Sequence, residues 1–374
     1  MKGESLRVTL FMPDLSGGGA ERAMLNLAEG LSQRCNVELV LTRFAGKYLE
    51  EAKAKTISLV DLKARRPRYS LPAFAQYIWT RKPHVVIATL ETPSVFAALT
   101  KQVMGSSAYK LIISEQNTPS KHYSNQKDPF LRSFPAWARF PYRWADKIVA
   151  VSNEVAEDTL RTYRLLPQKV LTIYNPVITP SFWTRRKAPA EHPFYKMQEP
   201  ILVAAGRLTL QKDFATLLRA FRLVLEQKKA RLIIFGEGPE RSRLEALVKS
   251  WNLSEYVSLP GFVKNLPAHM AQANLFVLSS KWEGLPTVLI EAIASGVPVV
   301  ATDCPSGPRE ILEEGRWGKL VPVGDVSALA KAILDQLANP IFPSKEAWRR
   351  FTLDEILDQW LSLIMELCHI KCLD

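Results

Sequence analysis

Two glutamates that enclose seven residues give the strongest chemical signal in the sequence. Glu283 and Glu291 flank a stretch with a glycine, a proline and the apolar run 288–290. The apolar residues 273–278 predict a buried strand, and Pro286 suits the first turn of a helix, where a missing N–H costs nothing. We therefore expect Glu283 in the loop at the carboxyl end of a strand. Glu291 should lie inside the next helix, where a ligand lying against that helix could meet both carboxylates.

The amino end of this predicted helix suits a phosphate, because its free N–H groups and positive dipole favour anions. The spacing of Glu283 and Glu291 is equally compatible with ordinary solvated carboxylates, since most carboxylates lie on protein surfaces. The rest of the pattern is needed to decide between these interpretations.

The string from Lys281 to Ala292 resembles the signature of the retaining nucleotide-sugar glycosyltransferases of family 4. The resemblance implies an α/β fold with two Rossmann-like domains facing each other across a cleft (the GT-B fold), and a C-terminal helix that crosses back to the first domain. It also implies that Glu283 contacts the donor sugar and that Glu291 holds the ribose hydroxyls.

A second motif follows the predicted strand 202–205. It runs Gly206-Arg207, four residues, then Lys212-Asp213, and it resembles the donor-diphosphate clamp of the same family. An arginine can donate forked hydrogen bonds to phosphate and a lysine adds a point charge, although a plain surface pair is the alternative. Together with the first motif, this one makes Arg207, Lys212 and Glu283 the candidate catalytic residues.

The other donor-side candidates lie in glycine-containing turns and at the start of the predicted helix. The loop 16–19 precedes a predicted helix over residues 20–31, but it lacks the G-x-G-x-x-G spacing of a dinucleotide site, and a simple tight turn is an alternative. The resemblance implies that the following residues contact the nucleotide sugar: Gly18, Gly19, Gly206, Gly236, Gly238, Phe262, Val263, Gly284, Leu285, Pro286, Thr287 and Glu291.

The acceptor side is less defined. Glu115 and Asn117 follow the predicted strand 110–114, and the carboxyl ends of strands in open α/β sheets face the ligand. Many members of the family carry a histidine or a Ser-Glu-Arg-Asn-like sequence at this place. The nearest histidine here, His122, is five residues beyond Asn117, so we assign it no role, and the identity of any acceptor-side base stays open.

The 374 residues suffice for two domains. We expect an acceptor-side domain over 1–178, with 350–374 packed back on it, a donor-binding domain over 179–349, and a proline-rich linker within 177–200. No 18-residue run lacks charges and helix breakers, the start lacks a signal-peptide core, and there are four cysteines. These features favour a cytoplasmic protein without a transmembrane helix. Cys368, His369 and Cys372 are too few to predict a metal site.

The net charge of +12 is uneven along the chain: residues 1–178 hold 25 lysines and arginines against 15 acidic residues, whereas residues 179–374 hold 24 against 22. This asymmetry predicts an anionic partner for the first domain. The sequence shows no zinc finger, RNA-recognition signature or basic zipper, so a membrane surface is favoured over nucleic acid.

Two segments could make such a membrane contact. One is a basic loop with Lys63, Arg65, Arg66 and Arg68. The other, residues 121–144, has large apolar residues on one predicted helical face and arginines between them. The alternative is a helix that packs on the first domain's core. The residues of that face and the arginines are Phe130, Phe134, Trp137, Trp144, Arg132, Arg139 and Arg143. We expect a peripheral protein on the inner face of the cytoplasmic membrane.

The reaction implied by the resemblance moves a hexosyl or N-acetylhexosaminyl group, with retention, from a nucleotide-diphosphate sugar to a hydroxyl of a lipid-linked or surface-glycan acceptor. UDP is the expected nucleotide. No Asp-x-Asp occurs in the sequence, so we expect neither a metal nor another cofactor, and protein cations would neutralise the diphosphate. A nucleotide-sugar epimerase and an inactive scaffold on the same fold are the alternatives, and the oligomeric state stays open.

Overall fold

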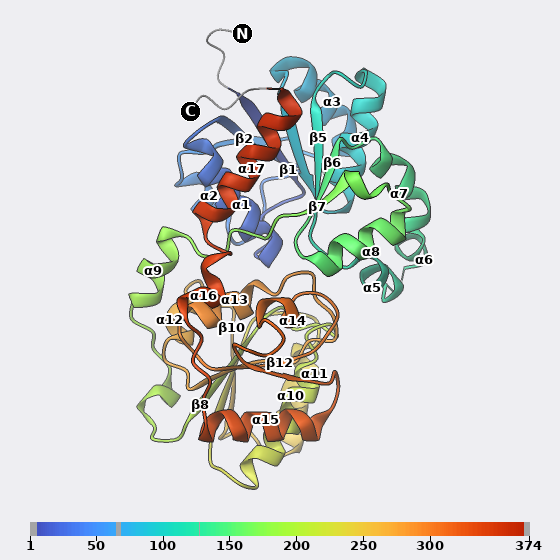
Figure 1. Ribbon diagram of the computed structural model, residues 1–374. Helices are drawn as coiled ribbons and strands as arrows, with labels where there is room; N and C mark the ends of the chain where they lie inside the picture. Colours follow the sequence, from blue (N-terminus) through green and yellow to red (C-terminus); the bar gives the residue numbers. More distant parts are fainter. Residues whose placement is uncertain (1–5, 65–68, 127, 370–374) are drawn as a thin grey trace. The chain divides into compact units, whose positions relative to one another are not determined.

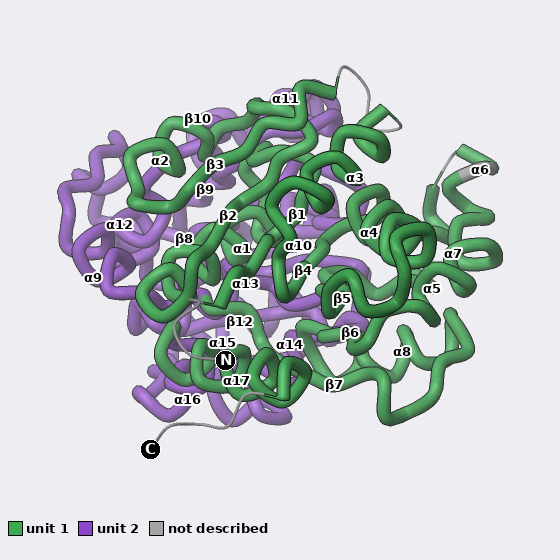
Figure 2. The backbone as a smooth tube through the Cα atoms, turned by 90° about the horizontal axis from the view of Figure 1, so that it is seen from above, with its two compact units in different colours: residues 1–176, 353–374 green, residues 177–352 purple. Residues whose placement is uncertain are grey.

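The computed structural model describes residues 6–64, 69–126 and 128–369. It divides into two compact units, residues 1–176 with 353–374 (unit 1) and residues 177–352 (unit 2), as Figure 2 shows. Each unit contains one parallel sheet with helices packed against it. The predicted α/β class with two Rossmann-like domains is confirmed.

The sheet of unit 1 has the strand order β3-β2-β1-β4-β5-β6-β7, and all neighbouring pairs are parallel. Its strands are β1 (Arg7–Met12), β2 (Asn36–Leu41), β3 (Ser58–Asp61), β4 (Val85–Thr89), β5 (Lys110–Glu115), β6 (Lys147–Ala150) and β7 (Val170–Thr172). Its helices are α1 (Gly19–Ser32), α2 (Leu49–Lys53), α3 (Ser70–Arg81), α4 (Glu91–Met104), α5 (Pro119–Ser124), α6 (Pro129–Arg132), α7 (Phe134–Arg143), α8 (Asn153–Tyr163), η2 (a 3-10 turn, Pro167–Lys169) and α17 (Leu353–Cys368).

Both faces of this sheet are buried, as expected for parallel strands. Side chains of β1 alternate between two apolar cores: Val8, Leu10 and Met12 pack with α1 and α17, whereas Phe11 packs with α3, α4 and α7. The period of two along an extended strand explains why the central strands are almost uniformly hydrophobic.

The C-terminal helix α17 returns to unit 1, as predicted, and lies beside α1 (Figure 1). Trp360 is 2% exposed in the core that the two helices share. Gly30 of α1 permits this close packing, because a Cβ there would lie 2.9 Å from Leu353 Cδ1.

Unit 2 has the strand order β10-β9-β8-β11-β12-β13, again parallel throughout. Its strands are β8 (Ile201–Ala205), β9 (Arg231–Phe235), β10 (Val257–Gly261), β11 (Leu275–Leu278), β12 (Val299–Thr302) and β13 (Lys319–Val321). Its helices are α9 (Pro180–Lys187), η3 (a 3-10 turn, Pro193–Lys196), α10 (Phe214–Leu225), α11 (Arg241–Ser250), α12 (Leu266–Met270), α13 (Thr287–Ala294), α14 (Pro308–Ile311), α15 (Val326–Ala338) and α16 (Lys345–Arg349).

The linker predicted within 177–200 is wrong, because this segment is folded into unit 2. It contains α9 and a 3-10 turn, and Phe182 in α9 is fully buried. The prolines begin these short helices, at a position where the missing N–H is tolerated.

The membrane-facing aromatic face predicted for 121–144 is also wrong. Phe134 is 3% exposed and stacks on Tyr123, while Trp137 and Trp144 pack against the core of unit 1. Phe140 of α7 is instead 49% exposed. Helical spacing shows which residues share a face, but not that this face turns inward. Arg65, Arg66, Arg68, Cys372 and the side chain of Phe130 lie outside the described part of the chain.

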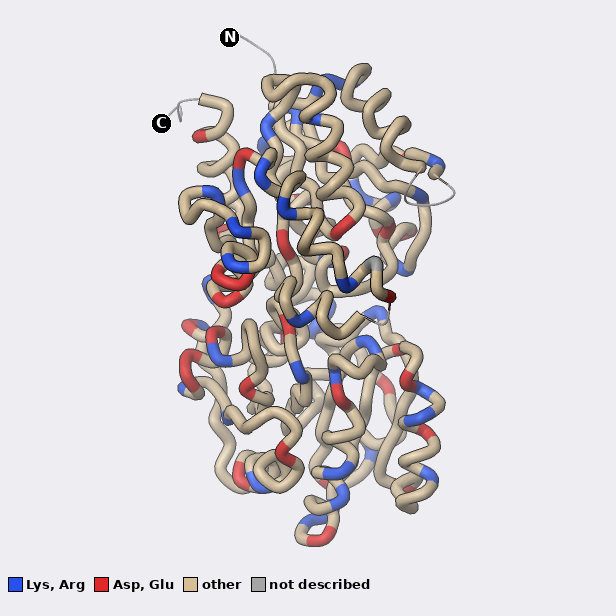
Figure 3. Tube along the Cα trace, turned by 90° about the vertical axis from the view of Figure 1, so that its right-hand side faces the viewer, with Lys and Arg blue, Asp and Glu red and all other residues tan. Residues whose placement is uncertain are grey.

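The predicted charge asymmetry disappears once the chain is divided as the structure divides it. Residues 353–374 belong to unit 1 and add five acidic residues and one lysine. Unit 1 then holds 26 basic and 20 acidic residues, and unit 2 holds 23 and 17, so each carries +6. Figure 3 shows lysines and arginines on both units. Within the described residues, no helix combines the length and apolarity needed to cross a membrane.

Candidate functional site

Each sheet reverses its winding direction at one place, between β1 and β4 in unit 1 and between β8 and β11 in unit 2. In open α/β sheets, ligands bind outside the carboxyl ends of the strands at such a switch point. The loops after β8 and β11 carry the two motifs singled out from the sequence, Arg207 with Lys212 and Glu283 with Glu291. The strand order therefore brings motifs about 70 residues apart to one edge of unit 2.

Lys212 and Glu283 form the centre of this edge. Lys212 Nζ lies 2.6 Å from Glu283 Oε1, and the two side chains are 14% and 7% exposed. Ser280 also donates a hydrogen bond to Glu283 Oε1, and Thr302 Oγ1 fixes the backbone of Ser280 through a 2.6 Å bond to its carbonyl oxygen. A largely buried carboxylate is thus compensated by one cation and one hydroxyl, as such groups require.

Arg207 differs from Lys212 in being exposed. Its side chain has no hydrogen-bond or ion-pair partner among the residues that the structure describes. Its guanidinium, on the same loop as Lys212, is therefore available for an anionic ligand without the loss of an existing contact.

Three predicted glycines let the loops after β8 and β9 pack closely. A Cβ on Gly236 would lie 1.9 Å from Gly206 O, and one on Gly238 would lie 2.3 Å from Leu208 O. Gly206 has φ +153°, and its Cβ would lie 2.9 Å from Lys212 Cε. The glycines thereby position the lysine, a role that the sequence pattern alone did not indicate.

Helix α13 begins at Thr287, and Pro286 is its N-cap, one position before the first-turn place predicted for it. Gly284 and Leu285 are buried beside this start. The loop after β12 packs against it, since a Cβ on Gly307 would lie 2.4 Å from Pro286 Cδ. Glu283 N donates to Pro305 O at 3.0 Å, so the loop after β12 contacts the amino end of α13 and the residues before it at two points.

The remaining donor-side candidates lie in separate places. Glu291 is half-buried within α13, and Phe262 and Val263 are half-buried after β10. Cys304 is buried next to Glu283, and burial together with the charge of that glutamate raises the pKa of its thiol. Cys35, Cys304 and Cys368 are free thiols. The described residues contain no group of three His, Cys, Asp or Glu placed to hold a metal.

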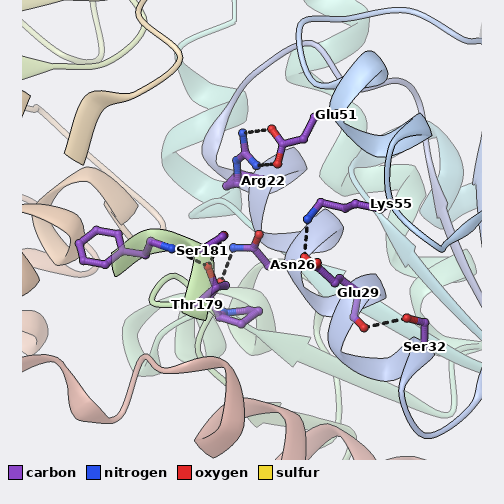
Figure 4. Close-up of polar contacts among 10 residues, drawn as sticks. Arg22, Asn26, Glu29, Ser32, Glu51, Lys55, Thr179 and Ser181 are labelled. Atoms are coloured by element: carbon purple, nitrogen blue, oxygen red, sulfur yellow. Dashed lines mark hydrogen bonds and ion pairs between the residues drawn. The ribbon is translucent and has the colours of Figure 1, made fainter. Parts of the chain in front are cut away.

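In unit 1, Gly18 and Gly19 lie at the start of α1, with Gly18 as its N-cap. The first turn of α1 is tied to α2, because Arg22 donates two hydrogen bonds to Glu51, one of them 2.8 Å long (Figure 4). One turn later, Asn26 Nδ2 donates to Pro176 O at 2.8 Å. These contacts hold the glycine-rich loop at the carboxyl end of β1.

The acceptor-side candidates lie at the end of β5. Glu115 is 8% exposed, with Tyr142 Oη 3.2 Å from its Oε2 and the backbone N–H of Asn117 3.4 Å from its Oε1. Burial, and next the negative charge of Glu91, raise the pKa of Glu115 to about 7. A carboxyl group with this pKa changes its protonation state near neutral pH.

The sequence reasoning missed Glu91 and dismissed His122, but the structure brings them together. His122 Nε2 on α5 lies 3.1 Å from Glu91 Oε1 at the start of α4. The available signal was that Glu91 follows the buried strand β4 just as Glu115 ends β5, and parallel strands place their carboxyl ends at one edge.

Comparison with known proteins agrees with this arrangement. The family described as "Glycosyltransferase Family 4" matches residues 17–179, and the family described as "Glycosyl transferases group 1" matches residues 199–339. The protein is therefore matched in both units by glycosyltransferase families.

Two relatives from Campylobacter jejuni span nearly the whole chain. The first is an N-acetylgalactosamine-N,N'-diacetylbacillosaminyl-diphospho-undecaprenol 4-alpha-N-acetylgalactosaminyltransferase, 28% identical, and the match covers 88% of this chain and 90% of the relative. The second is a GalNAc-alpha-(1->4)-GalNAc-alpha-(1->3)-diNAcBac-PP-undecaprenol alpha-1,4-N-acetyl-D-galactosaminyltransferase, 26% identical, with 96% of this chain and 99% of the relative covered.

Among solved structures, HepE of Anabaena in complex with UDP-glucose has the same fold, with a TM-score of 0.80 and 19% identity over 96% of this chain and 100% of that chain. Since the two family matches together span residues 17–179 and 199–339, the chain belongs to the glycosyltransferases that combine a family 4 domain with a group 1 domain.

Proposed function

We propose that this glycosyltransferase moves a hexosyl or N-acetylhexosaminyl group from a UDP-sugar to a hydroxyl of a lipid-linked glycan, with retention of the anomeric configuration. The observation that carries the proposal is the Lys212–Glu283 pair at the switch point of unit 2, with the exposed Arg207 on the same loop. Cations, a carboxylate and a helix amino end converge there, and a nucleotide-diphosphate sugar needs all three kinds of contact.

The difficult step is the departure of the nucleotide diphosphate, because negative charge develops on its oxygens. Arg207 and Lys212 would stabilise that charge through hydrogen bonds already in place before the reaction. The free N–H groups at the start of α13, around Leu285 to Thr287, would add their dipoles. The protein cations would thus take the role that a metal has in other transferases, so the reaction needs no metal.

Glu283 and Glu291 would recognise the two sugars of the donor. Glu283, 2.6 Å from the lysine that meets the diphosphate, would orient hydroxyls of the transferred sugar. Glu291 lies about one turn into α13 and would accept hydrogen bonds from the ribose hydroxyls. Carboxylates suit vicinal hydroxyls because two oxygens accept two donors.

The acceptor class is proposed from the two Campylobacter relatives, whose names describe diphospho-undecaprenol glycans and N-acetylgalactosamine transfer. UDP as the nucleotide agrees with the UDP-glucose bound to HepE. A contact with an anionic membrane surface agrees with such an acceptor. Its structural support is Phe140 of α7, exposed and flanked by Arg139 and Arg143.

The test is a thermal-shift screen of nucleotide sugars, followed by assays of the best donor with N-acetylgalactosaminyl-diphospho-undecaprenol and with a lipopolysaccharide core. We expect an acceptor lengthened by one sugar, and proton couplings of the new linkage that show the donor's anomeric configuration. An altered nucleotide sugar, or free nucleotide with no acceptor product, would favour the epimerase. If no nucleotide sugar changes the melting temperature, the result would favour an inactive scaffold.

A further inference from the structure

The backbone of Leu90 is held in a conformation that residues with side chains rarely adopt. Its φ and ψ are 67° and 169°, directly after β4 ends at Thr89. This region is nearly exclusive to glycine, and a residue with a side chain stays in it only where the surroundings impose it, typically at functional sites. Leu90 lies at the carboxyl end of β4, beside the switch point between β1 and β4, where a ligand of unit 1 is expected.

Glu91, the residue after Leu90, contacts His122. Glu91 Oε1 lies 3.1 Å from His122 Nε2, and the side chains are 30% and 26% exposed, so solvent reaches both. Gln126 Nε2 lies 3.3 Å from the same histidine nitrogen, but an Nε2–H that donates to Glu91 cannot also accept a hydrogen bond from this amide. Within the described part of the chain, His122 Nδ1 has no hydrogen-bond partner. A histidine that donates from Nε2 to the carboxylate keeps Nδ1 for another molecule, as an acceptor in the neutral imidazole and as a donor in the protonated one.

Helix α5, which carries His122, is fixed on two sides. Ser120 N donates to Asp158 Oδ2 of α8 at 2.8 Å, and Tyr123 stacks on Phe134 of α7 with ring centroids 4.8 Å apart. His122 meets the ring of Tyr123 edge-on at 4.9 Å. The imidazole is therefore already held in place in the free protein, which lowers the entropic cost of binding a ligand.

The charges at this edge favour a neutral ligand that donates hydrogen bonds. Burial opposes ionisation of Glu91, but the hydrogen bond and charge of His122, together with hydrogen bonds from the Glu91 backbone and from Tyr123, lower the pKa of Glu91, so the group is a carboxylate near neutral pH. Glu115, at the end of the neighbouring strand, is a second acidic group, and its pKa of about 7 leaves it partly ionised. Two carboxyl groups repel phosphate, whereas sugar hydroxyls donate readily to carboxylate oxygens.

We propose that Glu91 and His122 form a carbohydrate subsite that positions the acceptor. The carboxylate of Glu91 accepts a hydrogen bond from one hydroxyl, and Nδ1 of His122 bonds a second hydroxyl of the same sugar ring, as a donor when the imidazole is protonated and as an acceptor when it is neutral. The subsite rests on the proposed transferase function for its role as an acceptor site, but not for its ability to bind a sugar.

The experiment compares Glu91→Gln and His122→Asn with a control, Lys121→Gln, in the full-length protein. Lys121 is exposed on the same helix, and the described residues give its side chain no partner. Three quantities are measured: the KM and kcat for N-acetylgalactosaminyl-diphospho-undecaprenol, the Kd of UDP by calorimetry, and the saturation-transfer NMR signal of methyl α-N-acetylgalactosaminide.

We expect both test variants to raise the acceptor KM roughly 10- to 100-fold, the effect of losing a hydrogen bond to a charged group. Most of kcat and the Kd of UDP should be retained, the NMR signal should fall, and Lys121→Gln should behave as wild type. Unchanged acceptor KM values in both variants, or a parallel loss of UDP binding, would overturn the subsite.

The NMR arm separates this proposal from the proposed function. If wild type transfers no sugar but binds the methyl glycoside, and the two variants lose that signal, the subsite stands while the transferase proposal fails. If wild type gives no glycoside signal, or the variants give the same signal as wild type, the subsite is rejected whatever the transfer assay shows.

Discussion

Lys212 and Glu283 form a nearly buried ion pair although Arg207, five residues before the lysine, points its charge into solvent. The pair is 2.6 Å apart and the exposed fractions of its side chains are 14% and 7%. The two cations of the candidate clamp therefore have different structural roles. Removal of Lys212 leaves a buried carboxylate without its cation, whereas removal of Arg207 breaks no contact among the described residues.

This difference predicts distinct effects of Arg207→Ala and Lys212→Ala. Each should lower kcat on the order of 100-fold, because each removes a group that stabilises the leaving diphosphate. Only Lys212→Ala should also lower the free energy of unfolding, by about 1–3 kcal/mol, because it removes the cation that neutralises a buried carboxylate. Steady-state kinetics and thermal melts measure the two effects. Arg219→Ala, an exposed arginine of α10 in the same unit, is the control, and wild-type turnover in both clamp variants would reject the assignment.

Gly206 offers an independent test of how Lys212 is positioned. Gly206→Ala would place a Cβ 2.9 Å from Lys212 Cε at a backbone φ of +153°, so the lysine must move and activity should fall at least tenfold, about the effect of 1.4 kcal/mol on the barrier. Gly324→Ala is the matched control, since Gly324 also has a positive φ, +77°, but no atom lies within 4 Å of the added Cβ. Equal activities in the two variants would show that the contact with Lys212 does not matter.

The features that could be predicted from the sequence are those that depend on the local spacing of residues. The strand–loop–helix context of Glu283 and Glu291, and the loop with Arg207 and Lys212, follow from short apolar runs bounded by glycine and proline. The parallel sheets follow from the alternation of strands and helices.

What the sequence could not predict depends on contacts between distant segments. Glu91 and His122 are 31 residues apart, and they meet only because β4 and β5 pair in parallel. Phe134 and Trp137 share a helical face whose direction is set by Tyr123 and the core of unit 1. The predicted charge asymmetry was wrong because α17, with its acidic residues, belongs to unit 1.

The protonation of Glu115 predicts a pH-dependent stability. Its pKa is about 7 in the folded protein but about 4.3 when unfolded, so the folded state binds the proton more tightly. The contribution of this group to the free energy of unfolding is fully present below about pH 4.3, falls as the pH rises, and is lost above about pH 7, a change of up to about 4 kcal/mol. Thermal melts of wild type and Glu115→Gln from pH 5 to 8.5 measure it. As the pH rises, the melting temperature of the variant should increase relative to that of wild type. Parallel curves of melting temperature against pH would contradict the prediction.

Metal independence is tested by chelation. If Arg207 and Lys212 neutralise the diphosphate, activity should be unchanged after dialysis against EDTA and assay in its presence. The rate of sugar transfer is measured with EDTA alone, then with added magnesium or manganese as the control for enzyme integrity. A loss on chelation that either cation restores would show that a metal takes part.

Membrane contact should depend on Phe140 and the arginines around it. The guanidinium carbons of Arg139 and Arg143 lie 4.8 and 6.0 Å from the centre of the Phe140 ring, which is 49% exposed. An exposed aromatic ring between cations suits the interface of an anionic bilayer, where each basic residue near the surface contributes about 1 kcal/mol. Binding to anionic vesicles, measured by co-sedimentation, should weaken with salt and fall in the double variant Phe140→Ser with Arg143→Glu.

The matched control for this surface is Phe342→Ser with Lys345→Glu in unit 2, where Phe342 is 65% exposed and the change in net charge is the same. Because both units carry a net charge of +6, net charge alone would make the two double variants lose binding equally. A loss confined to the Phe140 variant therefore assigns the contact to α7, and an equal loss in both assigns it to general electrostatics. Wild-type protein that stays in the supernatant at low salt with anionic lipid would remove the membrane contact, while the assignments of Glu283 and Glu291 would stand.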